Sequence, residues 1–136
     1  MKANELMIGD YVYFNCFDGS KIIVKVTGFK DNIVYGVSEY GTHWCQISKV
    51  EPIPLTAEIL EKNGIKWLCT EPSGRKTYCC NEPVVQCTYI PDSGWLINAG
   101  VGGRIKVHFV EISKVQYVHE LQHALRLCDI EKEIIL

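Results

Sequence analysis

The chain has 136 residues, 47% hydrophobic and 22% charged, which suits a globular protein of one domain or two small modules. Its formal net charge of −2 provides no general attraction for nucleic acid or anionic membranes. The apolar runs are only strand-sized, and the first ten residues lack the apolar core of a secretory signal. These features exclude a membrane span and predict a cytoplasmic protein.

The first third of the chain has the pattern of short β-strands. Apolar and polar residues alternate, and turn residues such as Asp18-Gly19 and Asp31-Asn32 separate the alternating segments. The expected strands are residues 11–14, 21–26, 33–37 and 42–47. This spacing predicts a small β-barrel or meander over residues 1–52, for which an SH3-like barrel is the natural match in size.

A connector with a short helix is expected at residues 53–64. Pro52 and Pro54 favour an extended backbone, because proline restricts its own φ and the conformation of the residue before it. Thr56 is a suitable N-cap, and Gly64 is suited to the left-handed conformation that ends a helix near Asn63.

Residues 65–136 predict an antiparallel sheet followed by a helix, so the fold class is α+β with a high β content. The expected strands are residues 67–70, 75–80, 84–90, 95–98 and 104–109. In the first hairpin we expect Trp67 and Cys69 on one face, opposite Tyr78 and Cys80. The glycine-rich stretch 98–104 lacks the GK[ST] ending of a P-loop and favours a flexible hairpin loop over a phosphate cradle.

The last of these strands has a polar face of Arg104, Lys106 and His108. Such a face is typical of the solvated side of a sheet, and contact with nucleic acid is the weaker interpretation. The following helix is expected to begin at Ser113, with Gln116 completing a capping box. Its apolar stripe, which we expect to cover the dry face of the sheet, consists of Val118, Leu121, Leu125 and Cys128.

Two further patterns bear on fold and compartment. The chain has seven cysteines, an odd number, and no two of them form a C-x-x-C motif. Most lie among apolar residues, so reduced buried thiols are favoured over a disulfide framework or a zinc knuckle. The segments HWCQISKV (43–50) and HFVEISKV (108–115) share the tetrapeptide ISKV. The repeated tetrapeptide is better explained as the same short sequence used twice at the end of a β-strand than as a duplicated strand-and-helix unit, although duplication stays open.

Three segments together resemble a group of small uncharacterised proteins encoded in Bacteroides-type genomes, often near prophages or other mobile elements. They are MKANELMIGDYV (1–12), VEPIPLTAEILEKNGI (50–65) and YVHELQHAL (117–125). In the family pattern the last segment reads V-H-x-L-Q-N; His119, Leu121 and Gln122 match it, whereas position 123 is His instead of Asn. The resemblance implies a cytoplasmic protein associated with a mobile element.

The segment HELQH has the form H-E-x-x-H of zinc peptidases. In that interpretation His119 and His123 bind zinc from one helix face, and Glu120 activates a metal-bound water. Such a site requires a third protein ligand. Asp129 has the spacing for it, but Arg126 replaces the glycine at which the chain of longer zinc motifs turns back.

We therefore expect the helix to continue through Arg126, carrying Asp129 away from His123. The apolar stripe places both histidines on a solvated flank or outer face, next to Gln116 and Arg126. Upstream ligands remain open, namely His43, His108 and Glu111.

The sequence thus favours a non-enzymatic interaction or accessory protein of a mobile element, without a cofactor. The expected partner is a protein, and nucleic acid is a weaker alternative. A minimal zinc metallopeptidase that uses His119, Glu120 and His123, with Asp129 or an upstream group as third ligand, is the enzyme alternative. If the binding interpretation is right, the small β module should carry a contiguous exposed apolar or aromatic patch.

Overall fold

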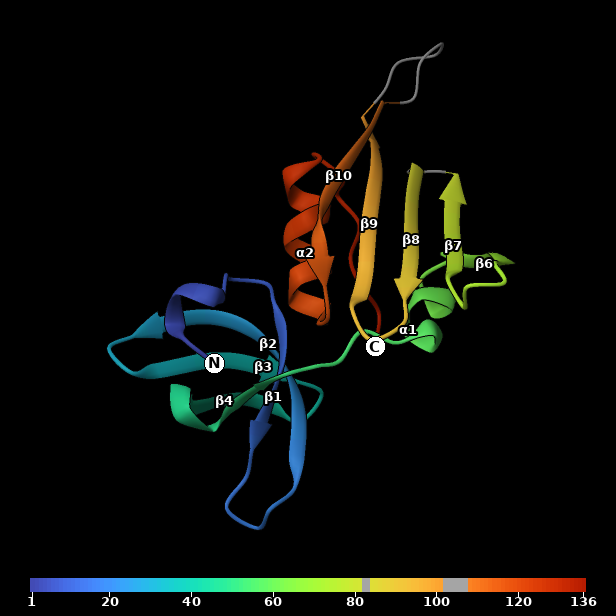
Figure 1. The fold of residues 1–136 in the computed structure, drawn as a ribbon. Helices are drawn as coiled ribbons and strands as arrows, with labels where there is room; N and C mark the ends of the chain where they lie inside the picture. The colour runs from blue at the N-terminus through green and yellow to red at the C-terminus, as the bar shows by residue number, and fades with distance from the viewer. Residues whose placement is uncertain (82–83, 102–107) are drawn as a thin grey trace. The chain divides into compact units, whose positions relative to one another are not determined.

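A computed structural model of the protein describes residues 1–81, 84–101 and 108–136 (Figure 1). The chain divides into two compact units. Unit 1 consists of Met1–Pro54 and Tyr117–His119, and unit 2 of Leu55–Gln116 and Glu120–Leu136. Both are built on antiparallel sheets, which confirms the β-rich α+β class. Within the described residues, no helix combines the length and the apolar character that crossing a membrane requires.

Unit 1 contains a sheet with the strand order β4-β3-β2-β1-β5. Four consecutive strands form a meander, and the fifth returns to pair with the first. Its elements are η1 (Ala3–Glu5), β1 (Tyr11–Asn15), β2 (Lys21–Lys30), β3 (Ile33–Ser38), β4 (Gly41–Gln46), η2 (Ile47–Lys49) and β5 (Val50–Pro52), where η denotes a 3-10 helix. The strands expected from alternation are all present, while closure into an SH3-like barrel stays a prediction.

One face of this sheet forms the apolar core of unit 1. Alternate residues of each strand face inward, so β1 buries Val12 and Phe14 while Tyr11 and Tyr13 stay partly exposed. The core cluster consists of Leu6, Val12, Phe14, Val24, Val26, Val34, Cys45 and Val50. Close packing requires glycine at position 36, because an added Cβ there would lie 2.1 Å from Val24 Cγ1.

Unit 2 contains a second sheet with the order β10-β9-β8-β7-β6. Its elements are α1 (Ala57–Lys62), β6 (Lys66–Thr70), β7 (Lys76–Asn81), β8 (Val84–Ile90), β9 (Gly94–Val101) and β10 (His108–Val115), followed by α2 (Val118–Leu127), whose first two residues belong to unit 1. The predicted limits of α1 are confirmed. The Thr56 Oγ1 atom accepts a hydrogen bond from the Ile59 N–H at 3.3 Å, and Gly64 has a φ of +78°.

The core of unit 2 lies on one face of its sheet. Val85 pairs with Ala99 and Cys87 with Ile97, and all four side chains are buried. Figure 1 shows α2 running alongside β10 and β9. The predicted helical stripe is confirmed as apolar and buried, and it consists of Val118, Leu121, Leu125 and Cys128.

Asn63 fastens the C-terminal tail of the chain to α1. Its Nδ2 group donates to the Ile135 carbonyl at 2.8 Å, and its Oδ1 atom accepts from the Ile135 N–H at 2.8 Å. The side-chain amide thereby pairs with both backbone groups of Ile135, as a residue of an adjacent strand would. The preceding residue, Ile134, is buried in the core.

Two expectations for the second half are wrong. The predicted helix start at Ser113 falls inside β10, and the helix begins at Val118. In the first hairpin, a β-bulge between Trp67 and Cys69 changes the register, so that Trp67 pairs with Tyr78 and Cys69 pairs with Thr77. Because neighbours along a strand alternate between faces, the bulge moves Cys69 off the Tyr78 face.

The segment between β8 and β10 is only partly described. β9 extends from Gly94 to Val101, so it is longer than the expected strand and includes the start of the predicted loop at 98–104. The proposed basic face falls outside the described residues at Arg104 and Lys106, and the His108 side chain is also outside them.

Candidate functional site

The two histidines of HELQH lie in different environments. His119 is buried, with 5% of its surface exposed, and its ring is stacked on Tyr117 at 5.9 Å between centroids and an angle of 12°. His123 is only partly buried. The expectation that both occupy a solvated face is therefore wrong for His119. The buried part of the helix is wider than its apolar stripe, because Gln122 is buried as well.

Glu120 has a structural contact at the start of α2. Its Oε2 atom accepts a hydrogen bond from the Gln116 backbone N–H at 2.7 Å. Gln116 lies two residues before the helix, so this bond joins the incoming chain to the first turn, where a carboxylate also interacts favourably with the helix dipole. The Val118 N–H, in turn, donates to the Ile53 carbonyl at 2.9 Å. Glu120 thus stabilises the start of the helix by holding Gln116, the residue that precedes the N-cap Tyr117.

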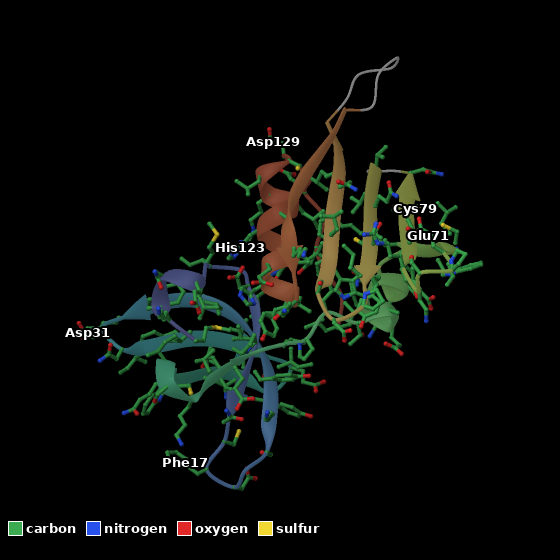
Figure 2. The ribbon with its side chains drawn as sticks, viewed as in Figure 1. Phe17, Asp31, Glu71, Cys79, His123 and Asp129 are labelled. Atoms are coloured by element: carbon green, nitrogen blue, oxygen red, sulfur yellow. The ribbon has the colours of Figure 1, made fainter. Side chains whose placement is uncertain are left out.

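The helix continues through Arg126, as expected, but it ends at Leu127, so the expectation that it also carries Asp129 is wrong. Asp129 adopts a φ of +55°, and the Ile130 N–H donates to the Leu125 carbonyl at 2.9 Å. The Asp129 N–H donates to the Arg126 carbonyl at 3.0 Å, which completes a Schellman motif with an aspartate in the usual place of glycine. Figure 2 shows Asp129 at the end of the helix and His123 partway along it.

The zinc interpretation also needs a third ligand. Among the residues whose side chains the structure describes, namely 1–81, 84–99 and 114–136, no group of three or more His, Cys, Asp or Glu is placed to hold a metal ion. Of the upstream candidates, His43 lies in β4 and its Nε2 atom is 2.7 Å from the Ser38 hydroxyl. The side chains of His108 and Glu111 lie outside the described residues.

A different site is present in unit 1, where one end of the sheet encloses a hollow of about 600 Å³. This volume falls within the range of small-molecule and peptide pockets. The hollow is formed by the end of β1 and the turn after it, the start of β2, most of β4, and η2. Its lining residues are Phe14, Asn15, Cys16, Phe17, Ile22, Thr42, His43, Trp44, Cys45, Gln46 and Lys49.

The hollow has a buried apolar floor and an exposed aromatic rim. Phe14 and Cys45 belong to the core of unit 1 and form the floor. Trp44 is 66% exposed, and Phe17, at the tip of the β1–β2 turn in Figure 2, is fully exposed. Large aromatic side chains that stay exposed beside an apolar concavity are typical of binding surfaces.

The electrostatic character of the hollow is nearly neutral. Burial raises the pKa of the Cys45 thiol, and the nearby Cys16 thiol acts in the same direction. The floor therefore stays uncharged at neutral pH. Lys49, which is exposed, is the one residue among Lys, Arg, Asp and Glu in the lining, all of whose residues are described.

The sequence predicted an exposed aromatic patch on the β module but did not locate it. The floor and rim come from segments about thirty residues apart, which pairing within the sheet brings together. Two local signals were available. Phe17 precedes the turn residues Asp18-Gly19, and Trp44 alternates with the inward-facing Cys45.

No protein-family model, curated protein or solved structure matches this chain. The geometry of the chain is therefore the basis for a functional proposal, and the resemblance to mobile-element proteins stays a prediction.

Proposed function

We propose that this chain is a non-catalytic binding module, an accessory protein of a prophage or other mobile element that binds a protein partner in the cytoplasm. The observation that supports binding is the hollow of unit 1 with its rim residues Trp44 and Phe17. The genomic setting and the compartment are supported by the sequence resemblance and the cysteine pattern alone.

The energetics of the rim favour a macromolecular partner. If a partner covers the exposed two thirds of Trp44, about 100–150 Å² of apolar surface leaves water. At about 25 cal/mol per Å², this burial contributes about 2.5–4 kcal/mol before the entropic costs of association. Tryptophan at the centre of an interface commonly dominates its affinity, so we expect Trp44 to be a principal contact.

Charge favours a protein over nucleic acid. A surface that binds a nucleic-acid backbone neutralises several phosphates with lysine or arginine. Lys49 is the single cationic residue in the lining of the hollow, and the chain as a whole has a net charge of −2. One cation beside an apolar floor instead suits a polypeptide with apolar side chains and few acidic groups.

Site-specific photocrosslinking tests this proposal. A benzoylphenylalanine residue replaces Phe17 in the full chain, which is expressed in its source organism and irradiated. The matched control carries the same residue at Trp67, an exposed tryptophan of unit 2. We expect a protein adduct from position 17 only, reduced at least about tenfold by Trp44→Ala. Equal adducts from both positions, or an adduct unaffected by Trp44→Ala, would contradict the proposal.

The zinc-peptidase alternative is tested separately. Elemental analysis of protein purified without a metal-affinity tag should find about one zinc per chain if His119 and His123 form a metal site. Loss of that zinc in a His123→Ala variant would assign it to the helix.

A further inference from the structure

Strand β4 is an edge of the sheet in unit 1, where it pairs with β3 on one side. One bond shows which residues of β4 direct their backbone N–H and C=O groups toward β3: the Ile47 N–H donates to the Asn32 carbonyl at 2.8 Å. In an antiparallel pair, hydrogen-bonded and non-hydrogen-bonded positions alternate. Counting back from Ile47, the backbone groups of Cys45 and His43 point toward β3. Those of Thr42 and Trp44 therefore point outward, away from the sheet.

The two edges of this sheet differ in how they are protected. Edge strands of natural proteins are usually short, or carry proline or charged residues that prevent pairing with other chains. β5 follows this rule, since it has 3 residues and contains Glu51 and Pro52. β4 does not, because its 6 residues, GTHWCQ, include neither proline nor a charged residue. An edge left open in this way is suited to accept a further strand.

The open edge and the hollow belong to one surface. Residues 42–46 of β4 line the hollow, and both Thr42 and Trp44 are exposed. A polypeptide laid along β4 would form hydrogen bonds with the N–H and C=O groups of these two residues. Because side chains alternate along a strand, every second side chain of that polypeptide would point toward the apolar floor at Phe14 and Cys45.

We propose that β4 binds an extended segment of the partner protein as an additional strand. This inference rests on the proposed function and names the form of its ligand. The segment has apolar residues at alternate positions, which enter the hollow, and a carboxylate that lies opposite Lys49. The outward N–H and C=O groups of Thr42 and Trp44 match the spacing of a polypeptide backbone, which a nucleic acid or a small apolar ligand does not reproduce.

A selected peptide and amide hydrogen exchange test the inference. Random peptides of about ten residues, long enough for a strand, are displayed and selected on the full chain. Counter-selection uses the Trp44→Ala variant. In the free protein, the amides of Thr42 and Trp44 should exchange quickly, whereas those of His43 and Cys45 should be protected by β3. The selected peptide should slow exchange at Thr42 and Trp44 at least about tenfold and leave the intervening residues nearly unchanged.

The peptide provides a second, complementary signature. N-methylation of single peptide amides removes one donor at a time without changing a side chain. Binding should weaken at least about tenfold at alternate peptide positions and little at the positions between them. Lys49→Gln should also weaken the binding of selected peptides that carry a carboxylate, and leave a peptide with glutamine in its place unaffected.

Four results would overturn the inference. The first is that selection enriches no peptide that prefers the wild-type chain over Trp44→Ala, and the second is that a peptide binds without the alternating protection. The third is that protection of Thr42 and Trp44 rises with protein concentration in the absence of peptide. The fourth is that single-stranded oligothymidylate competes with the peptide. The third result would assign the edge to a second copy of the chain, and the fourth would assign the surface to nucleic acid. A protein crosslink from position 17 without alternating protection would leave the proposed function standing and reject only strand addition.

Discussion

Glu120→Ala should destabilise the protein through the start of α2, because the Glu120 carboxylate accepts the Gln116 N–H at 2.7 Å. The variant removes a charged acceptor at the third position of the helix, where a carboxylate also interacts with the helix dipole. Gln116 is exposed, so its N–H can bond to water after the substitution.

The size of the effect follows from these two contributions. The net loss of one partly exposed hydrogen bond is about 1 kcal/mol, and the loss of the dipole interaction adds about 0.5 kcal/mol. Glu120→Ala should therefore lower the free energy of unfolding by about 1.5 kcal/mol. Glu120→Gln keeps an acceptor but loses the charge, so it should cost about 0.5 kcal/mol.

Urea denaturation followed by far-ultraviolet circular dichroism measures both variants, and Glu131→Ala, an exposed carboxylate beyond α2, serves as the control. Exchange of the Gln116 amide should also become faster in Glu120→Ala. If Glu120→Ala matches the wild-type stability within about 0.3 kcal/mol and the Gln116 amide keeps its protection, the capping role is refuted.

Three further predictions concern the cores and the C-terminal tail. Gly36→Ala should destabilise by about 3 kcal/mol, because its Cβ would lie 2.1 Å from a methyl carbon; Gly28→Ala, which meets no atom within 4 Å, should change urea stability by less than about 0.5 kcal/mol. Burial raises the pKa of Cys87 from 9.0 to about 12, so the stability this thiol contributes is complete below pH 9 and is lost as the pH rises toward 12. The loss amounts to about 1.4 kcal/mol at pH 10, and Cys87→Ala should show that much less alkaline destabilisation in urea. Asn63→Ala should cost about 2 kcal/mol and expose residues near Ile135 to carboxypeptidase, and an unchanged digestion rate would count against its anchoring role.

Local signals predicted the elements whose determinants are local. The cap at Thr56 and the glycine at position 64 define α1, because both act within a few residues of themselves. β8, Val84–Ile90, has the predicted limits, since turn residues flank an uninterrupted alternation of apolar and polar residues. In these cases propensity, pattern and tertiary packing agree.

The tetrapeptide ISKV shows where local prediction fails. In unit 1, Ile47–Lys49 forms a 3-10 turn after β4, whereas the second copy continues β10 to Val115. The difference arises from the neighbouring strand, because Ile112 and Val115 pair with residues of β9 across an irregular register. The same four residues therefore give a strand or a turn according to their partner. The expected helix start at Ser113 fails for this reason.

The binding surface was only partly predictable. Alternation in β4 places Trp44 on the face opposite Cys45, so an exposed tryptophan could be expected from the sequence. The hollow also requires the β1–β2 turn to bring Phe17 near that strand, and the open edge requires knowledge of the strand order. Neither follows from local pattern, because both depend on pairings between distant segments.

In the zinc motif, a clear local pattern was present in the sequence, but it can arise for a reason other than zinc binding. An H-E-x-x-H sequence at the start of a helix places its glutamate in the first turn, where a carboxylate is favoured for capping alone. In this chain Glu120 holds the Gln116 N–H, His119 stacks on Tyr117, and Leu121 is fully buried. A general base at Glu120 would have to act through its Oε1 atom or give up the bond that Oε2 accepts from the Gln116 N–H. The stability of Glu120→Ala and the zinc content of the protein therefore test two competing roles of one side chain, and we expect the capping role to prevail.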